Sequence, residues 1–190
     1  TGEDGGSESF TVALGSQPTA DVTLTVASTD TGEGLATPAT LVFTPATWNT
    51  PQTVSVAGVD DADIDGSQGY FVTLDAASAD TAYDGTSGAV AATNADDDSA
   101  SLVLSGGPLA TSESGASASF GVRLSSLPGA NVTVTLTSTR PGEALPAVQT
   151  LSFTPANWNT PQNVTVQGQD DTLVDGDRSF AITLTTTSAD

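Results

Sequence analysis

The sequence contains no cysteine, histidine, methionine or lysine, and its only basic residues are three arginines. Without cysteine the fold has no disulfides, and without cysteine or histidine it lacks the side chains that zinc prefers. No run approaches the roughly 18 consecutive apolar residues of a membrane-spanning helix, so we expect no membrane insertion. Histidine, cysteine and lysine supply many general bases and nucleophiles, and their absence argues against an enzyme.

The charge balance excludes two classes of partner. Acidic residues number 23, and the formal net charge is −20. Binding to nucleic acid needs basic patches that neutralise phosphates, and binding to an anionic membrane surface needs clustered basic residues. So large an imbalance also opposes a compact fold by self-repulsion. We therefore expect compensation by cations, either a bound divalent metal or the screening ions of a high-salt habitat.

A long internal repeat defines the domain organisation. The segment Leu41–Asp61, LVFTPATWNTPQTVSVAGVDD, recurs as LSFTPANWNTPQNVTVQGQDD at Leu151–Asp171. Trp48 corresponds to Trp158 at a spacing of 110 residues, with no gap needed. Solenoid repeats are shorter, at about 20–50 residues, so this repeat is a whole domain. The chain is predicted to be two tandem copies of one module.

Alternating apolar and polar residues predict β-strands, and no segment shows the apolar spacing of a helix. Threonine and valine dominate these runs, while glycine, proline, asparagine and aspartate interrupt them about every 8–12 residues, as in antiparallel sandwiches. The predicted fold class is therefore all-β, with one antiparallel sandwich per module. The predicted strands are Ser9–Leu14, Asp21–Val26, Thr53–Val56, Tyr70–Leu74, Leu102–Leu104, Ser119–Leu124, Asn131–Leu136, Asn163–Val166 and Phe180–Leu184.

The repeat also predicts that each module is incomplete. A strand at Ser101–Ser105 opens the second module, and nothing before Thr1 matches it. The segment Thr81–Asp98 closes the first module, and nothing after Asp190 matches that. We expect either a piece of a longer covalent array or a strand donated by an identical neighbouring subunit, and in both cases a fibre or stalk. No signal peptide is present at Thr1, which is expected of a mature or excised piece.

Acidic residues of the first module gather at strand ends rather than within strands. Because strands alternate in direction, these ends can meet at one edge of a sandwich, where unpaired carboxylates would repel one another. Calcium removes such repulsion, since it takes about 6–8 oxygen ligands in flexible geometry. Aspartate also favours turns for local reasons, which is the alternative explanation. The groups are Glu3-Asp4, Asp30 with Glu33, Asp60-Asp61, Asp63 with Asp65, and Asp96–Asp98.

The run Ser99–Leu124, SASLVLSGGPLATSESGASASFGVRL, followed by the acidic block Gly168–Leu184, resembles a Calx-β domain. That family is the immunoglobulin-like calcium-binding module of sodium–calcium exchangers, also found in bacterial surface proteins. The motif FTPAxWNTPQxVxVxG is similar to repeats of very large bacterial adhesins and surface fibres. The resemblance covers essentially the whole chain and implies two immunoglobulin-like (Calx-β-like) sandwiches. Residues 1–98 would form the first, lacking its first strand, and residues 99–190 the second, lacking its last strand.

The resemblance also implies which acids hold calcium, at the interdomain end of the first module and at matching places in the second. Arg140 stands where the first module has Asp30, so fewer or weaker sites are expected in the second. In the first module the implied ligands are Glu3, Asp30, Asp60, Asp61, Asp65, Asp96, Asp97 and Asp98. In the second module they are Glu113, Asp170, Asp171, Asp175 and Asp177.

These observations predict a non-enzymatic, calcium-binding, extracellular structural protein of the cell surface. Calcium would rigidify the joints between modules of an adhesin stalk or filament, whose partners are neighbouring repeats or identical subunits. The alternative is an adhesive module that binds a sugar or a protein, with Trp48 or Trp158 stacking on a sugar instead of anchoring the core. An enzyme is disfavoured further because adjacent carboxylates such as Asp60-Asp61 point to opposite faces of a strand.

Overall fold

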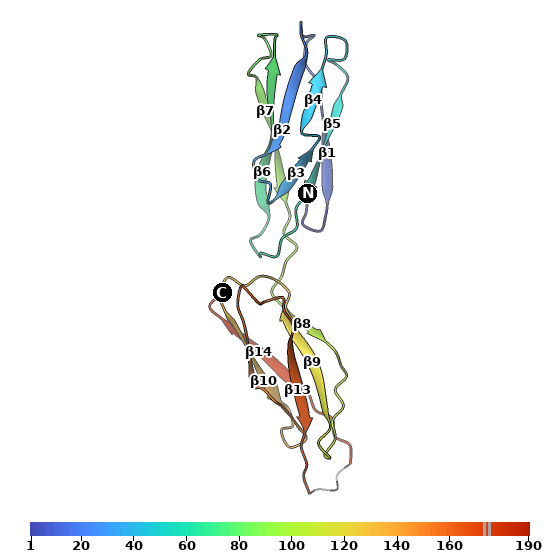
Figure 1. The fold of residues 1–190 in the computed structure, drawn as a ribbon, viewed down its shortest axis with the longest axis vertical. Helices are drawn as coiled ribbons and strands as arrows, with labels where there is room; N and C mark the ends of the chain where they lie inside the picture. Colours follow the sequence, from blue (N-terminus) through green and yellow to red (C-terminus); the bar gives the residue numbers. More distant parts are fainter. Residues whose placement is uncertain (173, 175) are drawn as a thin grey trace. The chain divides into compact units, whose positions relative to one another are not determined.

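The computed structural model describes residues 1–172, 174 and 176–190, and these form two compact units (Figure 1). The first unit comprises Thr1–Asp61 with Asp65–Asp97, and the second comprises Ala62–Ile64 with Asp98–Asp190. Both consist of antiparallel β-sheets, which confirms the all-β fold class with two tandem sandwiches. In the described part of the chain, no helix is long and apolar enough to cross a bilayer.

Two sheets make up the first unit, in the orders β1-β5-β3 and β4-β2-β6-β7. The chain passes from one sheet to the other and back after β2, because β3 pairs with β5 while β4 returns to β2. The strands are β1 (Ser7–Val12), β2 (Val22–Ser28), β3 (Gly34–Thr37), β4 (Thr40–Phe43), β5 (Gln52–Gly58), β6 (Gln68–Ser78) and β7 (Ser87–Asn94).

The second unit repeats this topology, with sheet orders β11-β13-β9-β8 and β12-β10-β14. Strand β9 corresponds to β1 and has β13 on one side and β8 on the other. The strands are β8 (Leu102–Ser105), β9 (Ser117–Leu124), β10 (Val132–Ser138), β11 (Ala144–Pro146), β12 (Thr150–Phe153), β13 (Gln162–Gly168) and β14 (Ile182–Ser188).

Each core lies between the two sheets of its own unit, because alternate residues of the central strands face inward. On β2, Val22, Leu24 and Val26 are buried while the intervening threonine and alanine residues are not. Phe43 is fully buried in the first core, and its counterpart Phe153 is fully buried in the second. Complete burial of such side chains contributes about 1.5–3 kcal/mol each, so these alternating faces hold each sandwich together.

The repeated tryptophan motif serves the same structural purpose in both units. The carbonyl of Trp48 accepts a hydrogen bond from the amide of Leu14 at 3.0 Å, and that of Trp158 accepts one from Leu124 at 2.9 Å. Each contact joins the turn before β5 or β13 to the chain directly after β1 or to the end of β9. The Trp158 side chain also packs against the second core, and the Trp48 side chain is half-buried. The Trp158 side chain therefore lies at the edge of its core, while the backbone contact of the motif is the same in both units.

The two units differ at the edge formed by β1. Among the described residues β1 pairs with β5 alone, whereas β9 pairs with both β13 and β8. Accordingly Val12 is only half-buried, while its counterpart Val122 is fully buried. The inward face of β1 is therefore less well covered than that of β9.

Candidate metal centre

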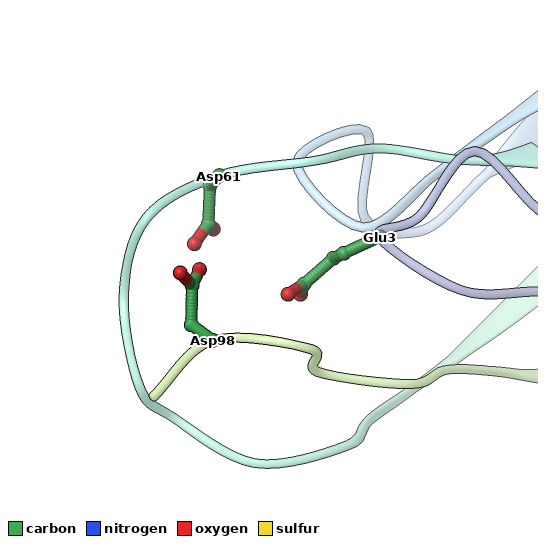
Figure 2. A group of neighbouring side chains, drawn as sticks. All are labelled: Glu3, Asp61 and Asp98. Atoms are coloured by element: carbon green, nitrogen blue, oxygen red, sulfur yellow. The ribbon is translucent and has the colours of Figure 1, made fainter. Parts of the chain in front are cut away.

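Three carboxylates from distant parts of the sequence meet at one end of the first sandwich (Figure 2). Glu3 precedes β1, Asp61 follows β5, and Asp98 follows β7. Each side chain offers a ligand oxygen, and these oxygens lie within 4.8 Å of one another. Figure 2 shows Asp61 and Asp98 pointing toward each other, with Glu3 reaching into the same space from the N-terminal segment.

Backbone pairing brings the Glu3 segment to the end of β7. The amide of Glu3 donates to the carbonyl of Ala95 at 3.0 Å, and the amide of Ala95 donates to the carbonyl of Thr1 at 3.2 Å. These bonds form a short parallel bridge between Gly2 and Ala95. Since the chain continues from Ala95 directly into Asp96–Asp98, the bridge fixes Glu3 beside that acidic run.

Burial and neighbouring negative charge both raise the pKa of Glu3, a residue that is only 3% exposed. Desolvation raises the pKa of Glu3 above its ordinary value of 4.5, and a hydrogen bond from the backbone amide of Asp97 partly opposes that shift. The negative charges of Asp61, Asp96 and Asp65 raise the pKa further. The buried Oε2 atom of Glu3 makes no hydrogen bond.

This donor set suits a hard cation. The meeting side chains provide carboxylate oxygens only, and the sequence offers no histidine or cysteine to supply nitrogen or sulfur. Calcium prefers such oxygen ligands and accepts irregular geometry, whereas structural zinc sites are built mainly from cysteine and histidine. A buried carboxylate oxygen without a hydrogen bond, facing further negative charge, is the local environment that a bound cation would stabilise.

The remaining acids predicted for the first unit differ in how they interact with this group. Asp65 and Asp96 are close enough to raise the pKa of Glu3 through their charges, and Asp96 Oδ2 also accepts a hydrogen bond from the Gly66 amide at 2.8 Å. Asp97 contributes its backbone amide. Asp60 is exposed and lies outside the group of three, although it is adjacent to Asp61. Asp30 accepts a hydrogen bond from the Gly32 amide at 3.0 Å within its own turn.

The second unit is organised differently. Asp175, one of the predicted ligands, lies outside the described residues. Among the residues that are described, Glu113, Asp170, Asp171 and Asp177 do not form a second group with three ligand atoms at this spacing. Glu113 and Asp177 instead line an open hollow of about 670 Å³, together with Glu143, Arg178 and Phe180 among other residues. Metal binding by any of the predicted residues in either unit stays a prediction.

Sequence reasoning did not identify Asn94, which is fully buried at the end of β7 next to the acidic run. Its side chain contacts the segments that carry Glu3 and Asp61. The alternation rule gives no signal for a buried polar residue at a strand end. The only available indication was its place directly before Ala95 and the triple aspartate.

No protein-family model and no curated protein matches the chain. Solved structures that match include the calcium binding domain CBD12 of CALX1.1, with 13% identity and a TM-score of 0.44 over 99% of this chain and 77% of that one. CBD12 from CALX1.2 has 13% identity and a TM-score of 0.41, covering 98% of this chain and 77% of that one.

Another match is the CsuC–CsuE chaperone–tip adhesion subunit pre-assembly complex of archaic chaperone-usher Csu pili from Acinetobacter baumannii. Its identity is 11% and its TM-score 0.39, over 97% of this chain and 92% of that one. Similarities this distant carry no argument about function, so a functional proposal depends on the residues of the site.

Proposed function

We propose that Glu3 and Asp61 of the first unit bind calcium together with Asp98, which directly follows that unit in the chain. The observation that carries this proposal is the Oε2 atom of Glu3, a buried carboxylate oxygen that makes no hydrogen bond. Burying a carboxylate with one oxygen left without a hydrogen bond is costly, and the neighbouring charges of Asp61, Asp96 and Asp65 add repulsion. A divalent cation among these oxygens reverses both effects, because each carboxylate gains an oppositely charged partner.

Calcium binding of this kind stabilises the folded state. The three ligands lie far apart in the sequence and meet only when β1, β5 and β7 are in place, so the unfolded chain offers no equivalent site. A ligand that binds only the folded state adds about 2.7 kcal/mol of stability at 100 times its dissociation constant. Calcium would therefore stabilise this end of the sandwich reversibly.

The wider role that we propose is structural. Calcium held by Glu3, Asp61 and Asp98 would order the segment through which the chain leaves the first unit and enters the second. Restricting that segment would stiffen the joint between modules, as an extracellular stalk or filament requires. The support for this role is the long repeat, the immunoglobulin-like sandwich architecture and the acidic, cysteine-free composition. The proposed function is accordingly binding and assembly rather than catalysis.

Calcium titration of the intact chain tests the proposal. Isothermal titration calorimetry should show saturable calcium binding, and the Glu3→Gln variant should bind much more weakly because it loses a charged ligand. Saturating calcium should raise the melting temperature of the wild-type protein by roughly 10 °C or more relative to chelator.

Two controls separate a site from general charge screening. Glu8→Gln makes the same chemical change at an exposed position of β1, and it should keep wild-type calcium affinity. Sodium chloride at matched ionic strength should reproduce little of the calcium effect. Equal calcium affinity in the Glu3→Gln and Glu8→Gln variants, or an equal response to sodium, would rule out the proposed site.

A further inference from the structure

Asn94 is a fully buried polar residue with three side-chain hydrogen bonds. Its Nδ2 atom donates to the carbonyl of Val59 at 2.9 Å and to Oε2 of Glu33 at 3.3 Å. Its Oδ1 atom accepts a hydrogen bond from Oγ1 of Thr1 at 3.1 Å. Both ends of the amide are therefore used, and the side chain is held in one orientation.

The partners of Asn94 belong to the segments that carry the three clustered carboxylates. Thr1 precedes Glu3 by two residues, and Val59 precedes Asp61 by two residues. Asn94 itself stands at the end of β7, in the segment that continues into Asp98. One side chain thus contacts all three segments behind the site. Strands β1 and β5 already pair with each other in one sheet, whereas Asn94 belongs to β7 of the other sheet, so its amide links the two sheets at this end.

We infer that Asn94 is a positioning residue for the proposed cation site, which holds the segments of Glu3, Asp61 and Asp98 at the spacing that a metal ion requires. The inference rests on the proposed calcium function and adds to it a residue that contacts no ligand atom. Residues behind a metal site commonly set its affinity in this way, and their loss typically weakens binding by about 10–100-fold.

Close packing at Gly58 supports this role. A Cβ atom at this position would overlap the carbonyl of Gly2 and lie 2.5 Å from Oδ1 of Asn94. The second unit keeps glycine at the corresponding Gly168, where a Cβ would overlap the backbone of Ser112. The end of β5 therefore has no side chain here because the N-terminal segment and the Asn94 amide occupy that space.

The chemistry of the amide explains why aspartate would not serve. The Nδ2 atom faces two acceptors, the Val59 carbonyl and the Glu33 carboxylate. A carboxylate at position 94 would present a lone pair and a negative charge to both of them. Asparagine is the side chain of this shape that donates on one side, accepts on the other and adds no charge.

Calorimetric titration of the intact chain with calcium, well below the melting temperature, tests the inference. The Asn94→Ala variant should bind calcium about 10-fold or more weakly than the wild type. Val22→Ala is the matched control, because it shortens a fully buried side chain of the same core at the far end of β6, where Val22 pairs with Ser78. That control should destabilise the unit and leave the calcium affinity near the wild-type value.

Amide hydrogen exchange in chelator provides a readout that does not depend on metal. The amides of Glu3 and Ala95 form the bridge between the N-terminal segment and the end of β7, and both should exchange faster in Asn94→Ala than in Val22→Ala. If Asn94→Ala does not fold, Thr1→Ala decides, because it removes only the contact of the Asn94 amide with the Glu3 segment and two neighbouring bonds of Thr1.

The outcomes distinguish the inference from the function on which it rests. Absence of calcium binding by the wild type would overturn the proposed function and this inference together. Binding by the wild type with an equal affinity in the Asn94→Ala variant would overturn the inference alone. Equal weakening in Asn94→Ala and Val22→Ala would also overturn it, since the effect would then come from lost stability. Selective weakening in the Asn94 variant, with faster exchange at Glu3, is the expected result.

Discussion

Gly34 and Tyr70 in the first unit occupy the positions that Ala144 and Phe180 occupy in the second. A Cβ atom on Gly34 would overlap the hydroxyl group and ring of Tyr70. The second unit has a methyl group at the first position and lacks the hydroxyl at the other. Ala144 is fully buried there, and Phe180 packs against the same core. The first unit therefore needs glycine at position 34 because the Tyr70 side chain occupies that space, while the second unit accommodates a methyl group at the corresponding position.

A double-mutant cycle tests this exchange. Gly34→Ala alone should destabilise the first unit by about 1–3 kcal/mol through overpacking, and Tyr70→Phe alone by about 1 kcal/mol through loss of its hydrogen bond with Thr1. The double variant should be more stable than the sum of these losses indicates, because removing the hydroxyl relieves part of the overlap and leaves a smaller shift of the ring to accommodate the methyl group. Urea unfolding measures all three, and additive losses would contradict the packing explanation.

Glu3 gives the first unit an unusual pH dependence when no calcium is present. Its pKa is higher in the folded state than the ordinary 4.5, so the folded state binds the proton more tightly than the unfolded state. In chelator, the stability of the first unit should therefore fall as pH rises from about 4.5 through the folded pKa. The measurement is the urea midpoint as a function of pH.

The Glu3→Gln variant should lose this slope and be at least as stable as the wild type in chelator at neutral pH. In saturating calcium the order should reverse, because the wild type regains stability through the metal and the variant does not. A wild-type midpoint that rises with pH in chelator over this range, or a variant that keeps the wild-type slope, would contradict the assignment.

At the scale of elements, Asp80 stabilises the connection from β6 to β7 through hydrogen bonds to the backbone. Its Oδ2 atom accepts a hydrogen bond from the Thr19 amide at 2.7 Å, and Oδ1 accepts one from the Ala82 amide at 3.0 Å. These backbone bonds lower the pKa of Asp80 below its ordinary value of 3.8. In the second unit, Asp190 accepts the equivalent bond from Gly129 at 2.9 Å. The same aspartate thus ties the start of β2 or β10 to the end of β6 or β14.

Asp80 should make the stability of the first unit depend on pH in the opposite sense to Glu3, and over a lower pH range. Its contribution is fully present above pH 3.8 and is lost as pH falls toward its lowered pKa. The Asp80→Asn variant should therefore be less stable than the wild type at pH 5 and should lose less stability on acidification. Asp75→Asn, at an exposed position of β6, is the control and should keep the wild-type profile. Parallel acid profiles for Asp80→Asn and the wild type would contradict the role of this carboxylate.

Alternation predicted most of the longer strands. Strands β2, β5, β6, β9, β10 and β13 are found at the predicted places, because valine and leucine alternate with threonine in most of them. The predicted strand at Leu102–Leu104 is β8, while β1 begins two residues earlier and β14 begins two residues later than predicted. Strand β7 was missed because its sequence SGAVAATN is rich in small residues and mostly exposed, so its pairing with β6 defines it. The short strands β3, β4, β11 and β12 were missed because three or four residues contain too little periodicity.

The candidate site could be predicted only in part. That acids at strand ends would meet follows from strand alternation, and Glu3, Asp61 and Asp98 do meet. Which acids of each pair or triplet meet depends on side-chain direction at the end of a strand, which periodicity does not determine. The role of Asn94 depends on three tertiary hydrogen bonds and therefore could not be read from the local sequence.

At the scale of the whole molecule, the two units are unequal copies. Among the described residues the clustered carboxylates are Glu3 and Asp61 of the first unit and Asp98, which directly follows that unit in the chain. The second unit has no such group of its own in the part that the structure describes, and it has Arg140 at the position of Asp30. Each unit also carries one tryptophan at a corresponding place, Trp48 in the first and Trp158 in the second. The two units can therefore be observed separately within the intact chain.

Tryptophan fluorescence should show calcium acting mainly on the first unit. In the Trp158→Phe variant the remaining Trp48 reports the first unit, and its thermal transition should move upward by roughly 10 °C or more on going from chelator to calcium. In the Trp48→Phe variant the transition reported by Trp158 should move much less. Equal shifts in both variants would indicate a second site of similar strength or a general effect of charge.

The bridge between Gly2 and Ala95 has a mechanical consequence. Thr1 and Asp98 lie at opposite ends of the first module in sequence, yet the parallel bridge joins their segments directly and the carboxylates of Glu3 and Asp98 lie close together beside it. Tension applied between these two ends would load that bridge in shear before it reached the sheets. A metal ion across the same gap would carry part of this load, so the calcium concentration would set the force that the module withstands before its strands separate.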